Sequence, residues 1–279
     1  METLSRVHHG FRPRLRRLAA TAFVAYVAWC VTVYAMQSRL LFMASVAGPG
    51  LSQAIIDAEP GLERHWIPAA DGARIEAWLV SCPARPAKGL VCFLHGNAEL
   101  IDDALHEARE WNARGFDVLL PEYRGYGRTS GTPSQAAIVM DVADAVEFAM
   151  MKGEHQRLIL HGRSLGTGVA AQVATGQEGR LAALVLESPF LSVASFAWRY
   201  GVPPVLVTNP FRTDEALPRI KATTLILHAA GDEIVPVEHG RALASASGAT
   251  IVELDGSHNS GLSLQREYWR AIDEHVLAR

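Results

Sequence analysis

The chain is poor in cysteine. Three cysteines in 279 residues, Cys30, Cys82 and Cys92, are too few for the disulfide framework that holds small secreted domains together. A single pairing of Cys82 with Cys92 remains open if the domain lies in an oxidising compartment. The length is sufficient for one large α/β domain with its own hydrophobic core and an N-terminal appendage.

Motifs that bind phosphate or metal are also missing. No glycine-rich loop ends in Lys-Ser or Lys-Thr, as phosphate-binding loops do. His95 is not accompanied by a second His, Asp or Glu at the spacing of metal ligands. The chain has neither internal repeats nor low-complexity tracts. We therefore expect a globular protein that works without a metal ion or cofactor.

Positive charge is concentrated at the N-terminus. Five of the first 17 residues are arginines and one is a glutamate, whereas residues 18–279 carry a net charge of −7. This acidic body disfavours a nucleic-acid partner.

The arginine cluster is followed by an uncharged apolar run, Leu18 to Met36, of 19 residues. At about 1.5 Å per residue the run approaches the ~30 Å hydrocarbon core of a bilayer. It predicts an uncleaved signal anchor at 18–36, with a basic tail at 1–17 in the cytoplasm. The rest of the chain would then lie across the membrane, periplasmic in a bacterium and lumenal or extracellular in a eukaryote. A cleaved signal peptide is the alternative, but its apolar core is usually shorter, about 7–15 residues.

Residues 37–60 are expected to form a juxtamembrane linker, and residues 61–279 the domain. Apolar or alternating segments predict strands at 64–68, 74–80, 89–94, 117–120, 158–161, 181–186, 223–227 and 250–254. Helical periodicity is found at 98–114, 135–151 and 264–277. Because strands alternate with helices from residue 89 onwards, we expect an α/β fold. Its mostly parallel central sheet would have helices on both faces and would be led by an antiparallel hairpin.

Residues 188–222 interrupt this alternation and are too long for a tight loop. In an open α/β sheet, loops after the strands surround the site, so this segment is expected to form a short lid. Phe190, Phe196 and Trp198 are the candidates to line an apolar substrate pocket beneath it. The alternative is that these aromatic residues pack onto the core.

The segment around Ser164 has the form of a nucleophile elbow. An apolar strand leads into Gly162-Arg163-Ser164-Leu165-Gly166, and small residues at helical spacing follow. The two glycines leave space where the strand and helix pass close to the turn. Leu165 begins the helix, so its N–H is free to face a developing oxyanion. A second N–H is expected from Asn97, in the loop after the strand 89–94.

A nucleophilic serine needs a base and an orienting carboxylate, and the sequence offers both in the expected order. Asp232 follows the strand 223–227, and His258 follows the strand 250–254. Both therefore lie at the edge of the sheet where Ser164 is expected. Glu187, after the strand 181–186, is the alternative acid, and His161 is expected to pack beneath the elbow.

Together these motifs resemble the α/β-hydrolase superfamily, and within it the membrane-anchored branch of serine aminopeptidase-like or hydrolase-4 domains. The matching motifs are His95-Gly96-Asn97-Ala98, Tyr123-Arg124-Gly125-Tyr126-Gly127, Gly162 to Gly168, Gly231-Asp232-Glu233-Ile234-Val235-Pro236 and Gly256-Ser257-His258-Asn259. The resemblance covers about residues 40–275. The branch includes lysophospholipase-like and depalmitoylase-like proteins. One departure is Glu99-Leu100, where relatives tend to have a small or polar residue.

The resemblance implies an α/β-hydrolase fold and a serine hydrolase that cleaves a carboxylic ester or thioester through an acyl-enzyme. Ser164, His258 and Asp232 would form the triad, and the N–H groups of Asn97 and Leu165 the oxyanion hole. The expected partners are the membrane and a small-molecule or lipid-like acyl substrate. A serine peptidase, or a catalytically silent scaffold that binds a lipid or partner, remains the alternative.

Overall fold

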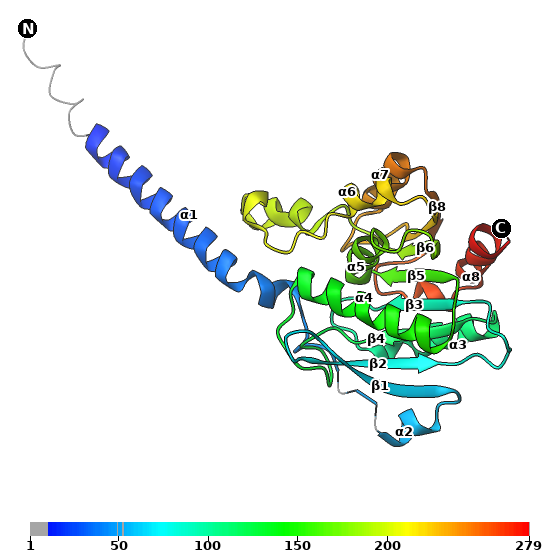
Figure 1. Cartoon of the computed structure of the whole chain (residues 1–279). Coiled ribbons are helices and arrows are strands. Elements are labelled where there is room, and N and C mark those ends of the chain that lie inside the picture. The colour runs from blue at the N-terminus through cyan, green and yellow to red at the C-terminus, as the bar shows by residue number, and fades with distance from the viewer. Residues whose placement is uncertain (1–10, 49, 52, 279) are drawn as a thin grey trace, which may run out of the picture.

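The computed structural model describes residues 11–48, 50–51 and 53–278 (Figure 1), and these form an eight-stranded sheet with helices on both faces. The strand order is β1-β2-β4-β3-β5-β6-β7-β8. Their bounds are β1 (Leu62–Pro68), β2 (Arg74–Val80), β3 (Leu90–Leu94), β4 (Asp117–Pro121), β5 (Leu158–Arg163), β6 (Leu181–Glu187), β7 (Thr223–Ala229) and β8 (Thr250–Leu254). The β1–β2 and β2–β4 pairs are antiparallel and all other pairs are parallel. The predicted mostly parallel sheet with a leading hairpin is confirmed.

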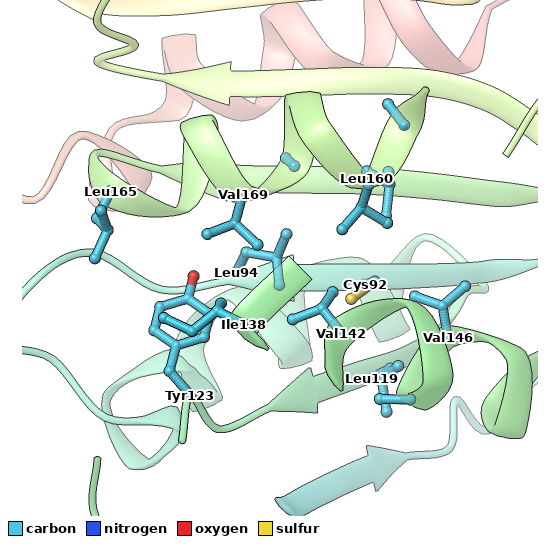
Figure 2. Packing of buried hydrophobic residues seen from close by; sticks show 14 of the residues in the cluster. Cys92, Leu94, Leu119, Tyr123, Ile138, Val142, Val146, Leu160, Leu165 and Val169 are labelled. Carbon is cyan, nitrogen blue, oxygen red and sulfur yellow. The ribbon is translucent and has the colours of Figure 1, made fainter. Parts of the chain in front are cut away.

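Two apolar cores lie on opposite faces of this sheet. Alternate residues of β3 separate into them: Leu90, Cys92 and Leu94 belong to one core, and Val91 and Phe93 to the other. The first core lies beneath α4 (Gln135–Lys152), α5 (Leu165–Ala174) and α7 (Val237–Ser247). The second lies beneath α2 (Gln53–Ala58), α3 (Leu105–Ala113) and α8 (Arg266–Ile272). Figure 2 shows side chains of α4 and α5 filling the layer against the sheet.

Two predicted helices differ from those observed. The helix expected at 98–114 begins later, as a 3₁₀ turn η1 (Ile101–Ala104) that leads into α3. Ala98 has a φ of 60°, in the left-handed region, so the chain cannot continue as a right-handed helix through this residue. The last helix, expected at 264–277, is α8 followed by a π-helical turn at 273–277.

The N-terminal helix α1 (Phe11–Leu41) is 31 residues long and projects from the domain (Figure 1). Its segment Arg14–Leu41 is long and apolar enough to cross a membrane. The helix continues five residues beyond the predicted anchor at 18–36, into the predicted linker at 37–60. Directly after it, Phe42 is buried in the first core, so this end of the helix is docked on the domain. Residues 1–10 of the predicted basic tail lie outside the described residues.

The lid segment, residues 188–222, contains short helical turns rather than a continuous helix. These turns are η2 (Val193–Tyr200), η3 (Pro204–Leu206), α6 (Thr213–Ala216) and η4 (Leu217–Arg219). In Figure 1 the yellow-green part of this segment extends from the domain towards α1. It follows β6, whose carboxyl end lies beside that of β5 and therefore beside Ser164.

Candidate active site

Ser164 occupies a strained turn between β5 and α5. Its φ of 50° and ψ of −114° are unusual for a residue with a side chain, and such backbone strain is typical of functional sites. A Cβ on Gly162 would overlap the carbonyl of Gly166, and a Cβ on Gly166 would overlap the carbonyl of Leu94. Glycine is therefore required at both positions for α5 to pass close to β5 and to the end of β3.

The side chains of Ser164, His258 and Asp232 form a continuous chain of hydrogen bonds. His258 Nε2 lies 2.9 Å from Ser164 Oγ, and His258 Nδ1 lies 2.7 Å from Asp232 Oδ2. The other carboxylate oxygen of Asp232 accepts the backbone N–H groups of Ile234 (3.0 Å) and Val235 (2.7 Å). The three residues come from the loops after β5, β7 and β8, which end at the same edge of the sheet.

The surroundings of Asp232 keep it ionised. Burial alone would raise the pKa of this carboxyl. Hydrogen bonds from His258 and from the Val235 N–H outweigh burial and hold its pKa below the usual range. An ionised carboxylate at this position orients the imidazole and would stabilise the imidazolium that forms when His258 accepts a proton.

Among the described residues, the loop after β3 leaves the Asn97 N–H without an acceptor. The Gly96 N–H donates to Glu99 Oε2 (2.7 Å), and the Ala98 N–H donates to Asn97 Oδ1 (3.1 Å). Within the described residues, the N–H of Asn97 and that of Leu165 have no acceptor. The two N–H groups predicted for the oxyanion hole are therefore both available to a ligand.

Two ion pairs that the sequence did not reveal support this loop. His95 is buried, with Nε2 2.8 Å from Glu122 Oε1 and Nδ1 2.8 Å from the Gly96 carbonyl. Both partners can accept a hydrogen bond, so these surroundings favour the doubly protonated ring. Burial lowers the pKa of His95, but the Glu122 carboxylate outweighs it and the pKa is raised overall. Glu99, the departure from the family pattern, pairs with Arg163 Nη2 at 2.7 Å.

The Asn97 side chain connects this loop to α1. Its Nδ2 donates to the carbonyl of Leu41, the last residue of α1, at 2.6 Å. Its Oδ1 accepts the Met43 N–H at 2.9 Å and the Tyr126 hydroxyl at 2.7 Å. The residue predicted to supply an oxyanion-hole N–H therefore holds the end of the apolar helix. No local sequence signal reveals this contact, since the partners are more than 50 residues apart.

Glu187, the alternative acid, does not contact His258; its Oε2 accepts the hydroxyl of Tyr268 (2.8 Å). Tyr268 in turn lies 2.7 Å from His161 Nε2, and His161 Nδ1 accepts the indole N–H of Trp111 (3.0 Å). Burial lowers the pKa of His161 to about 3, so the ring is neutral and its remaining proton is on Nε2. Burial also raises the pKa of Glu187 to about 7. This buried network lies beneath the elbow, as expected for His161.

The three aromatic residues predicted to line a pocket lie in different surroundings. Phe190 is buried with its ring against Gly168 of α5. Phe196 packs against the first core and stacks on His239, with ring centroids 5.0 Å apart. Trp198 is exposed. Phe190 and Phe196 thus have the contacts of core residues, which was the alternative interpretation of the sequence. A substrate-binding role for the three residues stays a prediction.

The part of the chain that the structure describes holds no metal site, and one sizeable cavity lies away from Ser164. No group of three His, Cys, Asp or Glu side chains there could hold a metal ion. A cavity of about 660 Å³ lies at the other end of α5, between Gln172 and Lys221. Since Ser164 precedes the first residue of this helix, the cavity is separate from the candidate site.

Comparison with known proteins gives the same fold and indicates a family. The profile of the family described as serine aminopeptidase, S33, matches residues 85–209. The uncharacterised protein Rv2307c of Mycobacterium tuberculosis is 30% identical over 84% of this chain and 84% of its own length. The lysophosphatidylserine lipase ABHD12 of Bos taurus is 29% identical over 55% of this chain and 44% of its own length.

A solved structure, the Pyrococcus furiosus esterase Pf2001, superimposes with a TM-score of 0.66. It is 17% identical and covers 84% of this chain and 95% of its own, so the likeness shows the fold alone. With the family match, the relative of similar length and the shared architecture, this chain belongs to the α/β-hydrolase superfamily, in the serine aminopeptidase (S33), or hydrolase-4, family.

Proposed function

We propose that the protein is a membrane-anchored serine hydrolase that cleaves a carboxylic ester or thioester, with Ser164 as nucleophile, His258 as general base and Asp232 as the orienting acid. The observation that carries the proposal is the unbroken series of hydrogen bonds from Ser164 Oγ through His258 to Asp232, at 2.9 and 2.7 Å. These distances allow a proton to move from the serine to the imidazole without rearrangement.

The residues act in two half-reactions. Ser164 Oγ attacks the substrate carbonyl carbon while His258 Nε2 takes its proton, and the carbonyl oxygen becomes an oxyanion. The N–H groups of Asn97 and Leu165 donate to this oxyanion. His258 then protonates the leaving oxygen or sulfur, and an acyl-enzyme ester remains on Ser164. Water attacks this ester, with His258 again as base, and the acid and free serine are released.

An apolar acyl group is the substrate feature that the chain favours. Leu41, the last residue of helix α1, is hydrogen-bonded to the side chain of Asn97, so the candidate site lies beside the domain end of the proposed anchor. Acyl chains partition into a bilayer, and each buried methylene contributes about 0.8 kcal/mol. The relative ABHD12 is described as a lysophosphatidylserine lipase, which supports a lipid-like substrate. We therefore favour medium or long acyl chains over small soluble esters.

The nucleophile is tested with a fluorophosphonate probe, which labels activated serines. The unchanged chain should be labelled at a single site, and Ser164→Ala should abolish labelling while the melting temperature stays unchanged, since one oxygen is removed. Labelling of Ser164→Ala at the original rate would contradict the assignment. A folded wild-type chain that neither labels nor hydrolyses esters would favour the silent scaffold.

The acyl preference is tested with p-nitrophenyl esters from acetyl to dodecanoyl. A rise of kcat/KM with chain length supports an apolar acyl site. A preference for acetyl, with a steep loss beyond butanoyl, would contradict it while leaving the serine hydrolase intact. Aminoacyl p-nitroanilides in the same assay serve as the test for a peptidase.

A further inference from the structure

The tip of the lid segment, residues 196–207, lies alongside α1. The indole N–H of Trp29 donates to the carbonyl of Tyr200 at 2.9 Å. Eight residues further along the helix, the amide of Gln37 donates to the carbonyl of Leu206 at 3.1 Å. Eight residues of α-helix span about 12 Å, so the tip follows α1 over at least that length.

These contacts place the tip at the depth of lipid hydrocarbon if α1 crosses a membrane. About 20 residues are needed to cross the ~30 Å core, which a segment beginning at Leu18 reaches near Gln37. Trp29 is then about 12 Å inside the boundary, close to the bilayer centre. A tip that contacts Trp29 cannot lie in water on either side of the membrane.

The composition and exposure of the tip suit such a position. Its twelve residues include one charged side chain, Arg199. Trp198, Tyr200 and Val205 are 64%, 65% and 87% exposed. Exposed large apolar side chains gathered in one short segment mark an interaction surface rather than a surface that faces water. Arg199 is exposed, but its guanidinium reaches back to the domain, where Nη1 lies 3.4 Å from the Ile234 carbonyl.

Most backbone N–H groups between Gly201 and Val207 have an acceptor, and unpaired N–H groups are costly in hydrocarbon. Gly201 and Val202 donate to carbonyls of the preceding turn η2, and the N–H groups of Leu206 and Val207 donate to the two prolines at 203 and 204. The prolines themselves have no N–H. At the end of the tip, the Thr208 N–H donates to Gln37 Oε1 at 2.8 Å.

We propose that residues 196–207 are embedded in the membrane leaflet on the side of the domain, as a second membrane-inserted element beside α1. A groove of about 310 Å³ between α1 and the tip, lined by Tyr26, Val27, Cys30, Val31, Tyr34 and Leu206, accepts a lipid acyl chain. The proposal rests on the membrane anchor of the proposed function.

The embedded tip gives an acyl substrate a route to the triad. Arg199, within the tip, donates to the carbonyl of Ile234 at 3.4 Å. The N–H of the same residue, Ile234, donates to Asp232 at 3.0 Å. Through Arg199 the tip thus contacts the loop that holds the candidate acid, and this contact offers an acyl chain a path from the leaflet towards Ser164.

The test uses the full chain in phosphatidylcholine nanodiscs, with Ser164→Ala in every sample so that no outcome depends on hydrolysis. Single cysteines are introduced as Val205→Cys in the tip, Val24→Cys in α1 and Met151→Cys at the far end of α4. All three positions are well exposed, at 87%, 65% and 71%. Each is labelled with a fluorescent maleimide, and quenching by nitroxide-labelled acyl chains is measured. The chain without added cysteines, whose own three are buried, supplies the background.

Val205→Cys and Val24→Cys should both be quenched by the lipid nitroxide and should react with a membrane-impermeant maleimide about tenfold more slowly than Met151→Cys, because water is excluded from the hydrocarbon. Trp198→Cys replaces Val205→Cys if that variant does not fold. Quenching of Val24→Cys without quenching in the tip overturns the embedded tip and leaves the anchor intact. If neither position is quenched, the anchor fails and the embedded tip fails with it.

Discussion

Replacement of Asp232 by asparagine tests the roles in the triad directly. Asp232 Oδ1 accepts two backbone N–H groups, from Ile234 and Val235. In Asp232→Asn only the carbonyl oxygen can accept these bonds, so the amide NH₂ must turn towards His258. His258 Nδ1 then becomes an acceptor and the ring proton moves to Nε2, the nitrogen that faces Ser164. A protonated Nε2 in a neutral ring cannot take the serine proton.

The expected loss is large because the base is held in the wrong tautomer. In the best-studied serine protease triad this change lowers kcat by about 10⁴, equivalent to about 5.4 kcal/mol at 1.36 kcal/mol per tenfold. In this chain the N–H groups of Ile234 and Val235 fix the orientation of the side chain at position 232. We therefore expect a similar loss in kcat, with KM little changed.

The measurement is kcat at neutral pH with a p-nitrophenyl ester, together with the rate of fluorophosphonate labelling. Glu187→Gln is the matched control, because Glu187 lies at a neighbouring strand end but contacts Tyr268 instead of His258. This control should keep kcat within about tenfold of the original. If Glu187→Gln is the more damaging change, or if Asp232→Asn retains more than a tenth of the activity, the assignment of the acid is wrong.

Two further predictions concern stability and the oxyanion loop. The pKa of Glu187 is raised to about 7 from an ordinary 4.5, so the folded state binds this proton more tightly than the unfolded state does. The stability that the bound proton contributes is complete below pH 4.5 and is lost as the pH rises towards 7. Relative to the original chain, Glu187→Gln should therefore gain about 3 kcal/mol of unfolding free energy between pH 4.5 and 7.5 in urea titrations; a difference that stays flat with pH would contradict this. Asn97→Ala keeps the backbone N–H but removes the side-chain hydrogen bonds to Leu41, Met43 and Tyr126. We expect kcat to fall by about tenfold or more, but by less than the 10²–10³ that loss of an oxyanion-hole donor costs. An unchanged kcat would show that this side chain does not position the loop.

The local sequence was sufficient for the fold and for the position of the elbow that carries Ser164. Apolar runs of four to six residues, separated by segments of helical periodicity, predict the parallel strands because each such strand must bury both faces. The elbow around Ser164 is recognisable because its glycines lie in one short motif. The requirement at 162 is local, since a side chain there would overlap the carbonyl of Gly166, whereas the one at 166 comes from the distant carbonyl of Leu94. Asp232 and His258 could be placed because carboxyl ends of parallel strands meet at one edge.

Which polar groups pair within that edge is decided only by the tertiary structure. Asp232 and Glu187 both lie at the ends of buried strands, and the sequence favoured Asp232 as the acid with Glu187 as the alternative. The structure directs Asp232 to His258, while Glu187 faces Tyr268 from the last helix. The choice depends on side-chain directions across strands far apart in the chain, which no local pattern encodes.

The contacts of α1 with the domain were equally inaccessible from the sequence. An apolar run predicts a helix and its length, because both follow from properties of consecutive residues. It does not predict that Asn97 holds the end of this helix, or that Trp29 donates to Tyr200 across 171 positions of chain. Those bonds exist because the folded domain brings the loop after β3 and the lid segment to the same side. Their geometry is a property of the packed molecule and of no single segment.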